Sequence, residues 1–212
     1  MKTIDASELC RLLTCRSRGT RVLAAIAGPP GSGKSTLAEA IVAQINDAEP
    51  GRAAVLPMDG YHFDDALLVQ LGRKERKGAP DTFDVPGLRQ MLTRLRGGCE
   101  EAVAVPVFDR GLEISRAAAR FIPPLTDIIV VEGNYLLLRL PPWHTLKPLF
   151  DLTVMMDVPE ATLRQRLTAR WQGFSLPPAE VSRKVEQVDL PNGVLVQRES
   201  SRPDYVIPTL DP

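Results

Sequence analysis

The sequence has no hydrophobic run long enough to span a membrane and no excess of charge of either sign. Its 26 Lys and Arg residues balance 26 Asp and Glu residues, and no basic tail stands apart from the rest of the 212-residue chain. Proteins that bind nucleic acid or an anionic membrane carry a basic surface. We therefore expect neither nucleic-acid binding nor membrane insertion, and the N-terminus lacks the uninterrupted apolar segment of a signal peptide.

Cysteine is scarce as well. Cys10, Cys15 and Cys99 are odd in number and lack the spacing of a zinc site or a CxxC redox motif. We therefore expect reduced thiols in a cytoplasmic protein. A chain of this length can bury roughly 70% of its unfolded surface, so it needs no disulfide or metal for stability. The composition, 44% hydrophobic and 25% charged residues, is that of a folded globular protein.

Short β-rich runs alternate with helical periodicity, which is typical of a parallel α/β sheet. Residues 21–27 are nearly all apolar, as in a central strand buried on both faces. Further strands are expected at residues 53–57, 128–132, 152–157 and 205–207, and helices at residues 34–47, 84–96, 159–171 and around 181–188. No repeat or low-complexity linker divides the chain, so we expect one domain over residues 1–212.

A separate hairpin is expected from residues 102–108 and 117–121. Pro106 cannot donate to a ladder, so this pair should lie off the main sheet. Asp109 and Arg110 close the first of these strands, and we expect both to face the substrate.

The most specific motif lies between the first predicted strand and the helix that follows it. Residues 28–35, GPPGSGKS, match G-x-x-x-x-G-K-[ST] in full. Small residues let backbone amides surround a phosphate at a helix N-terminus, where the helix dipole also favours an anion. Lys34 should contact the β- and γ-phosphates, and the Ser35 hydroxyl should bind Mg²⁺. The predicted nucleotide-binding residues of this segment are Gly28, Gly31, Ser32, Gly33, Lys34, Ser35 and Thr36.

Two carboxylates follow predicted strands. Glu132 lies where residues 128–132 pass into a loop, and Asp59 follows residues 53–57. Ligands of α/β sheets gather beyond the carboxyl ends of the strands. We predict that Glu132 contributes to the magnesium site, directly or through water, and that Asp59 accepts the proton of an attacking substrate hydroxyl. For Glu132 the alternative is a surface carboxylate that merely ends its strand.

Residues 58–63, MDGYHF, form the predicted acceptor loop. Gly60 permits a tight turn, and we expect Tyr61 and His62 to wall a small pocket. For His62 a partly buried ring in a loop is an equally open alternative.

Positive charge for the transferred phosphate is expected from the helix at residues 159–171. Arg166 and Arg170 lie four residues apart and share a face. The turn at residues 172–178 follows, and residues of about 164–192 are predicted to form a lid that closes arginines over the phosphates. The alternative is a pair of solvated arginines on an amphipathic helix.

These blocks, taken in order, resemble the phosphoribulokinase, uridine kinase and pantothenate kinase group of P-loop kinases. The similar blocks are GPPGSGKST, MDGYHF, KGAPDTFDVPGL, PVFDR, IIVVEGNYLLL and FDLTVMMDVPEATLRQRLTAR, and the resemblance extends from Val22 to Ile207. It implies a three-layer α/β/α P-loop NTPase sandwich with a mainly parallel five-stranded core sheet and a small lid. It also matches Asp59 to the catalytic aspartate, Lys34 and Ser35 to the phosphate and magnesium residues, Glu132 to the second acidic residue and Arg170 to the lid arginine.

Within that group the chain is most similar to short bacterial members described as fructose transport system kinases. They share a block similar to residues 189–192, DLPN, in which Asn192 is expected to hold the nucleotide base or shape the lid. A uridine kinase would carry a DSFY-like loop in place of MDGYHF, so the resemblance implies the donor chemistry but does not identify the acceptor.

The resemblance implies an ATP-dependent phosphotransferase with ATP and Mg²⁺ as cofactors. It would transfer the γ-phosphoryl group to a hydroxyl of a small metabolite, with a sugar such as fructose as the lead acceptor and pantothenate or a nucleoside as alternatives. A GTPase is disfavoured because no N-K-x-D or T-K-x-D motif is present. A non-catalytic ATP-binding module is the alternative of another class, and the sequence leaves a homodimer open.

Overall fold

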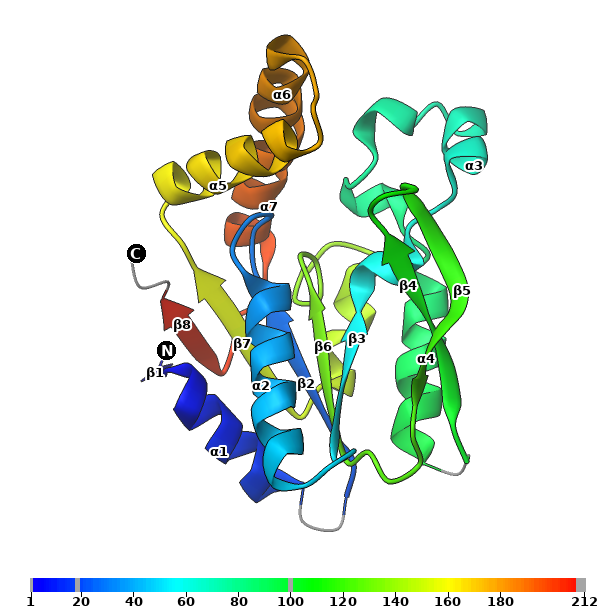
Figure 1. Cartoon of the computed structure of the whole chain (residues 1–212), viewed down its shortest axis with the longest axis vertical. Coiled ribbons are helices and arrows are strands. Elements are labelled where there is room, and N and C mark those ends of the chain that lie inside the picture. The colour runs from blue at the N-terminus through cyan, green and yellow to red at the C-terminus, as the bar shows by residue number, and fades with distance from the viewer. Residues whose placement is uncertain (1, 18–19, 99–100, 209–212) are drawn as a thin grey trace.

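The computed structural model describes residues 2–17, 20–98 and 101–208, and Cys99 lies outside them (Figure 1). Six strands form one sheet in the order β1-β8-β7-β2-β6-β3, and β4 and β5 form a separate pair. The strands are β1 (Lys2–Thr3), β2 (Val22–Ala27), β3 (Ala53–Pro57), β4 (Val103–Asp109), β5 (Ile114–Ile122), β6 (Ile128–Gly133), β7 (Leu152–Asp157) and β8 (Tyr205–Pro208).

The predicted α/β class with a mainly parallel sheet is confirmed. Every ladder of the six-stranded sheet is parallel. All five predicted core strands are present, and the sheet has a sixth strand that the sequence did not indicate. This strand, β1, has two residues and pairs with β8, so it is too short to show a periodic pattern.

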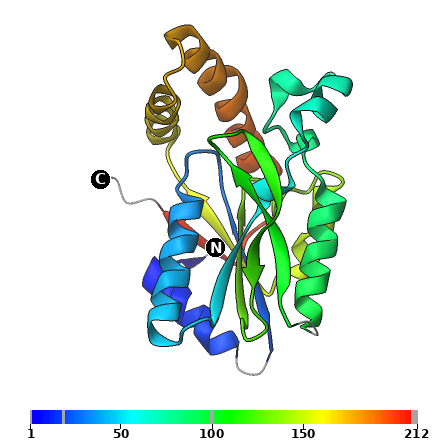
Figure 2. The same ribbon diagram turned by 45° about the vertical axis from the view of Figure 1, so that its right-hand side comes forward.

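The helices cover both faces of this sheet (Figures 1 and 2). They are α1 (Ala6–Arg16), α2 (Lys34–Ala48), α3 (Asp65–Gln70), α4 (Val85–Gly97), α5 (Glu160–Gly173), α6 (Pro178–Lys184) and α7 (Leu190–Glu199). A π-helical turn, Val185–Asp189, joins α6 to α7. Within the described part of the chain, no helix combines the length and the apolar character needed to cross a membrane.

The central strand β2 explains the layering. All six of its residues are buried. Val22, Ala24 and Ile26 pack with α1 and α2, and the alternate residues pack with α4 and β4 on the opposite face. A strand with a hydrophobic layer on each side has no polar face, which is why residues 21–27 show no alternation.

The β4–β5 hairpin lies off the main sheet, as predicted, beyond β3 (Figure 2). Its ladder is antiparallel, and its register shifts between Val105 and Val107. Pro106 sits at that irregularity, where its missing N–H breaks no ladder bond. The hairpin tip, α3, α5 and α6 all lie at the same end of the sheet as the loop between β2 and α2 (Figure 1).

We predict that Arg21 stabilises the folded protein by bonding to three loop and helix carbonyls at the opposite end of the sheet. Its guanidinium donates to the carbonyl oxygens of Thr126, Leu95 and Pro124 at 2.8, 2.7 and 3.0 Å. Arg21→Ala should lower the free energy of unfolding by about 2 kcal/mol, because three carbonyls lose a charged donor. Denaturant unfolding measures this change. Arg16→Ala, at an exposed position of α1, is the control, and equal stability of the two variants would contradict the prediction.

Candidate active site

The loop between β2 and α2 encloses the Lys34 side chain. Gly31 and Gly33 have φ angles of +78° and +89°, a left-handed conformation that glycine adopts without strain. The Lys34 ammonium donates to the Pro29 carbonyl at 2.9 Å and lies 3.5 Å from the Ser32 hydroxyl. Only 7% of Lys34 is exposed, and burial lowers the pKa of its ammonium to about 8.

Glu132 occupies the position predicted for it, at the carboxyl end of β6. It pairs in register with Ile26 of β2 on one side and with Pro57 of β3 on the other. Burial, together with the negative charge of Asp59, raises the pKa of the Glu132 carboxyl to about 7, against the opposing effects of Lys34 and the Ser35 hydroxyl. A buried carboxylate beside a hydroxyl and an ammonium is a suitable oxygen ligand for Mg²⁺.

Asp59 lies in a 3₁₀ turn, Met58–Tyr61, directly after β3. Arg110 of the hairpin donates to its Oδ2 at 2.8 Å. Burial alone would raise the pKa of Asp59, but positive charges outweigh it, and its pKa lies below the ordinary value. These charges are those of His62, which is protonated at the acidic pH at which a carboxyl titrates, and of Arg110, Lys34 and Arg170. Asp59 is therefore an ionised carboxylate at neutral pH.

Two glycines fix the turn that carries Asp59. A Cβ on Gly60 would lie 2.5 Å from the carbonyl oxygen of Pro106 in β4, and a Cβ on Gly133 would lie 2.4 Å from the Cβ of Met58. The turn thus lies so close to the hairpin and to β6 that a side chain at either glycine position would collide with its neighbour. Gly60 is required for this close approach of two backbones rather than for the tight turn that the sequence suggested.

His62 follows the turn and lies against two aromatic rings. Its centroid is 4.0 Å from that of Phe83 and 4.7 Å from that of Phe108. Its Nδ1 is 2.8 Å from the backbone oxygen of Asp59, so Nδ1 must carry the proton. Burial lowers the pKa of the ring, which leaves His62 neutral at pH 7 with Nε2 as a hydrogen-bond acceptor.

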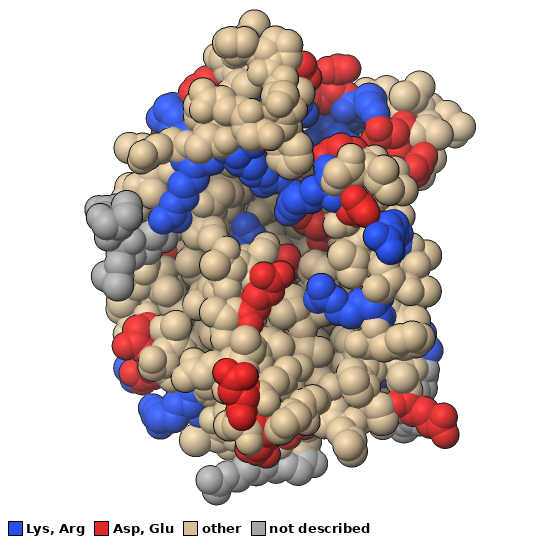
Figure 3. All heavy atoms as spheres, viewed as in Figure 1, with Lys and Arg blue, Asp and Glu red and all other residues tan. Residues whose placement is uncertain are grey.

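A cleft of about 1200 Å³ connects these groups. Basic and acidic side chains gather around the hollow below the uppermost helices in Figure 3. Its described lining includes twelve of the predicted site residues: Gly31, Ser32, Gly33, Lys34, Ser35, Thr36, Asp59, His62, Arg110, Glu132, Arg166 and Arg170. Segments that are far apart in the sequence therefore meet in one cavity.

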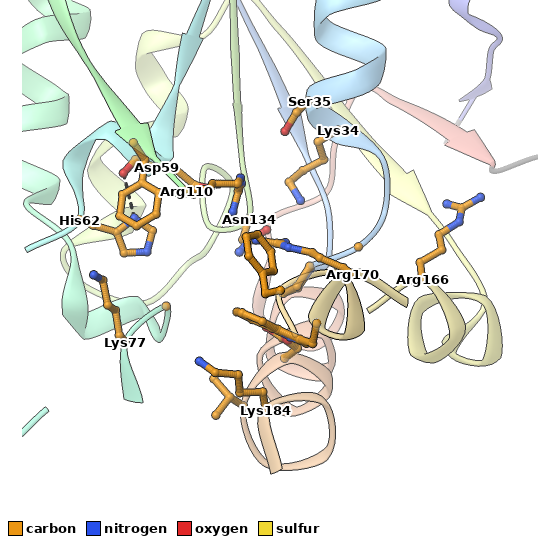
Figure 4. Close-up of a pocket in the computed structure, with 18 of the residues that line it drawn as sticks. Lys34, Ser35, Asp59, His62, Lys77, Arg110, Asn134, Arg166, Arg170 and Lys184 are labelled. Carbon is orange, nitrogen blue, oxygen red and sulfur yellow. Dashed lines mark hydrogen bonds and ion pairs between the residues drawn. The ribbon is translucent and has the colours of Figure 1, made fainter. Parts of the chain in front are cut away.

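Arg170 and Arg166 both extend from α5 but differ in direction. Arg170 points into the cleft beside Asn134, whereas Arg166 points away from the other labelled side chains (Figure 4). Burial and the neighbouring charge of Arg110 lower the pKa of Arg170, as expected of a cation held in a partly desolvated site.

Four predicted site residues do not line the cleft. Tyr61 is 8% exposed and packs in the core with α4, so the expectation that it walls a pocket is corrected. Asp109 accepts hydrogen bonds from Gly111, Leu112 and Arg116 and closes the hairpin turn instead of facing a substrate.

The other two, Gly28 and Asn192, contact residues that line the cleft, Met156 and Gly78. A Cβ on Gly28 would lie 2.8 Å from the Cβ of Met156, so this glycine lets the loop pack on β7. Asn192 is buried and donates to the Gly78 carbonyl at 3.3 Å. That contact fits the lid-shaping alternative for Asn192 and not the base-binding one.

The structure adds cleft residues that sequence reasoning missed. They include Lys77, Asn134, Trp171, Lys184 and Asp189. The Lys77 ammonium bonds to the Asp65 carboxylate at 2.7 Å and to the Glu113 carbonyl at 2.6 Å. Asn134 follows the predicted strand end at Glu132 by two residues, which was a usable signal, but nothing in the sequence placed Lys77 opposite the hairpin.

A glycine-rich loop joins the central parallel strand β2 to α2, and carboxylates lie at the carboxyl ends of β6, its neighbour, and β3, the next strand. This arrangement defines a P-loop nucleotide-binding fold. No family model matches the chain. It is 30% identical over 198 residues to a proposed uridine kinase of Schizosaccharomyces pombe, which covers 90% of this chain and 84% of the relative. It is also 28% identical over 177 residues to a pantothenate kinase of Nitrobacter hamburgensis. That match covers 76% of this chain but only about half, 52%, of the relative.

Among solved structures, a proposed fructose transport system kinase from Silicibacter sp. TM1040 is 34% identical, with a TM-score of 0.87 over 96% of this chain and 98% of that one. A P-loop kinase fold from Saccharomyces cerevisiae, YFH7, shares the architecture at 19% identity and a TM-score of 0.82. The chain belongs to the P-loop kinase family that contains the uridine and pantothenate kinases.

We predict that Lys34 destabilises the nucleotide-free protein. A lysine whose pKa falls on folding, here from 10.5 to about 8, weakens the folded state wherever it is charged there. Lys34→Met should therefore raise the free energy of unfolding at pH 7 by about 1–2 kcal/mol, and this gain should shrink as the pH rises from 8 towards 10.5.

Denaturant unfolding at pH 7 and pH 10 measures both effects. The same variant should lose the rise in melting temperature that Mg-ATP gives the unmodified protein. A variant that is less stable at pH 7 would show that the loop needs this ammonium even when it is empty.

Proposed function

We propose that the protein is an ATP-dependent kinase that transfers the γ-phosphoryl group of Mg-ATP to a hydroxyl of a small metabolite. One observation carries the proposal: the ionised Asp59 carboxylate shares a cleft with the Lys34 ammonium, the Glu132 carboxyl and the Arg170 guanidinium. Kinases of this family use ATP and generally Mg²⁺. A cytoplasmic location is part of this proposal.

The residues divide into a donor end and an acceptor end. The backbone amides of residues 31–35 and the Lys34 ammonium bind the donor phosphates. Ser35 and Glu132 would hold the metal ion, which supplies charge neutralisation when it is bound. Since Mg²⁺ in such sites takes one or two protein oxygens and completes its shell with phosphate and water, this pair suffices.

Asp59 orients the acceptor hydroxyl and takes its proton as the oxygen attacks the γ-phosphorus and the bond to the ADP oxygen breaks. Arg110 holds the Asp59 carboxylate in the cleft through the 2.8 Å contact. Arg170, with Arg166 on the same helix, neutralises charge on the transferred group when residues 164–192 close as a lid.

A sugar such as fructose is the lead acceptor. The acceptor end offers ring faces from His62, Phe83 and Phe108, against which the C–H faces of a sugar can pack. Cations there already have carboxylate partners: Lys74 and Lys77 both pair with Asp65. An uncharged polyol bonds to such pairs without breaking them, whereas the carboxylate of pantothenate would compete with them. The name of the Silicibacter relative points the same way.

We predict that Asp59→Asn lowers kcat by about 10²–10⁴-fold and leaves the affinity for Mg-ATP nearly unchanged. The amide keeps the shape of the carboxylate but cannot take a proton. Steady-state kinetics and nucleotide titration measure the two quantities. Asp47→Asn, at an exposed position near the end of α2, is the matched control. Loss of Mg-ATP binding in Asp59→Asn would instead assign Asp59 to the metal site.

We predict that ADP release from Mg-ATP is stimulated most by a sugar within a panel of sugars, pantothenate, glycerate and nucleosides. Stimulation by pantothenate or by a nucleoside would replace the lead acceptor with that alternative. Mg-ATP binding without stimulation by any member, and with no difference between the unmodified protein and Asp59→Asn, would favour the non-catalytic ATP-binding module.

A further inference from the structure

A cluster of charged and aromatic side chains lies on the lid side of the cleft, and among its members only Arg170 has a role in the mechanism above. The indole Nε1 of Trp171, in α5, donates to Oδ2 of Asp189 at 2.7 Å. Both residues line the cleft. The bond joins α5 to the turn between α6 and α7, 18 residues further along the chain.

The local backbone explains how Asp189 reaches this place. It is the last residue of the π-helical turn Val185–Asp189, which interrupts the helical segment between α6 and α7. Val185, the first residue of this turn, and Leu190, the residue after it, are both buried in the core. A π turn adds one residue to a helical turn and rotates the residues that follow, and such turns are frequent at functional sites.

The Trp171 ring carries two cations from different helices. The guanidinium carbon of Arg170 lies 5.3 Å from the ring centroid and the Lys184 ammonium lies 4.3 Å from it. Both distances are within the range of a cation–π attraction. The orientation of this ring therefore affects where the two cations lie, and the hydrogen bond that its indole donates to Asp189 fixes the ring.

Charged groups surround the Asp189 carboxyl. Burial raises its pKa above the ordinary value, and the hydrogen bond from Trp171 and the charges of Arg170, Lys184 and Arg110 only partly offset that effect. Arg170 in turn has Asp189 among the carboxylates that favour its charged form. Asp189 thus bonds directly to Trp171, while the cleft cations act on its carboxyl through charge alone.

We infer that Asp189 is a positioning residue for phosphoryl transfer: by bonding the indole of Trp171, it holds Arg170 towards the transferred phosphate. This inference rests on the proposed function, because it assigns Arg170 to that phosphate. If Asp189 had only a structural role, its loss would lower turnover whether or not Arg170 were present. As a positioning residue, it affects turnover only through the position of Trp171 and Arg170.

The test compares Asp189→Ala with Asp189→Asn, whose amide oxygen can still accept the indole hydrogen bond. Asp189→Ala should lower kcat by at least about 10-fold, with KM for ATP within about 3-fold, whereas Asp189→Asn should stay within about 3-fold of the unmodified enzyme. Trp171→Phe, which removes only the donor and part of the ring, should match Asp189→Ala. Glu186→Ala, in the same turn but bonded to Arg164 on the outside, is the control and should leave kcat unchanged.

A double variant tests whether Asp189 acts through Arg170. If Asp189 acts through Arg170, adding Asp189→Ala to Arg170→Ala should lower kcat no further. Multiplication of the two losses would overturn the inference, as would a loss in Asp189→Asn equal to that in Asp189→Ala. Melting temperatures identify any variant whose loss reflects misfolding, and Trp171→Phe then supplies the test.

A binding measurement separates this inference from the proposed function. The ratio of the Kd values for Mg-ADP and for a non-hydrolysable Mg-ATP analogue reports contacts to the γ-phosphate without any acceptor. Arg170→Ala and Asp189→Ala should each reduce this ratio about 5-fold, and the double variant no more than either alone. An unchanged ratio in Asp189→Ala overturns the inference, whereas absence of acceptor-dependent turnover in the unmodified protein would overturn the proposed function alone.

Discussion

The parallel pairing of three neighbouring strands, β3, β6 and β2, is the constraint on which the cleft depends. Because their carboxyl ends meet at one edge of the sheet, the phosphate-binding loop, Glu132 and Asp59 lie together although more than 70 residues separate Asp59 from Glu132. A slip of one residue in the β3–β6 register would turn Glu132 to the opposite face.

The second requirement is that the antiparallel hairpin approach this edge closely. Gly60 makes room for the hairpin and Gly133 makes room for Met58 of the turn, and the hairpin brings Arg110 to Asp59. The two carboxylates then differ in their proton affinity: the pKa of Asp59 is lowered by the cations around it, and that of Glu132 is raised by burial. One fold thereby provides a carboxylate suited to orient a hydroxyl and another suited to a metal ion.

Most of the donor end could be predicted from the sequence, because β2, the loop and α2 are contiguous and each has a local signature. Asp59 and Glu132 could be predicted because they end strands. Tyr61 could not be placed, since neighbouring residues of a 3₁₀ turn point in different directions and Tyr61 turns to the core. Asp109 is satisfied within its own hairpin. Lys77 and Asp189 reach the cleft through short and π-helical turns, which leave no periodic pattern.

The carbonyl of Gly78 accepts two hydrogen bonds from different parts of the molecule, from Tyr135 at 2.6 Å and from Asn192 at 3.3 Å. The start of α7 is therefore bonded, through Asn192, to the loop that contains Gly78 on the acceptor side of the cleft. If the proposed lid closes while this bond holds, α7 stays in place and only the part of the lid before residue 190 moves. A bend in the π turn and another where the chain enters α5 would then let α5 and α6 approach the cleft. On that account the Gly78 carbonyl, 114 residues from Asn192 in the sequence, marks where the part of the chain that is free to move ends.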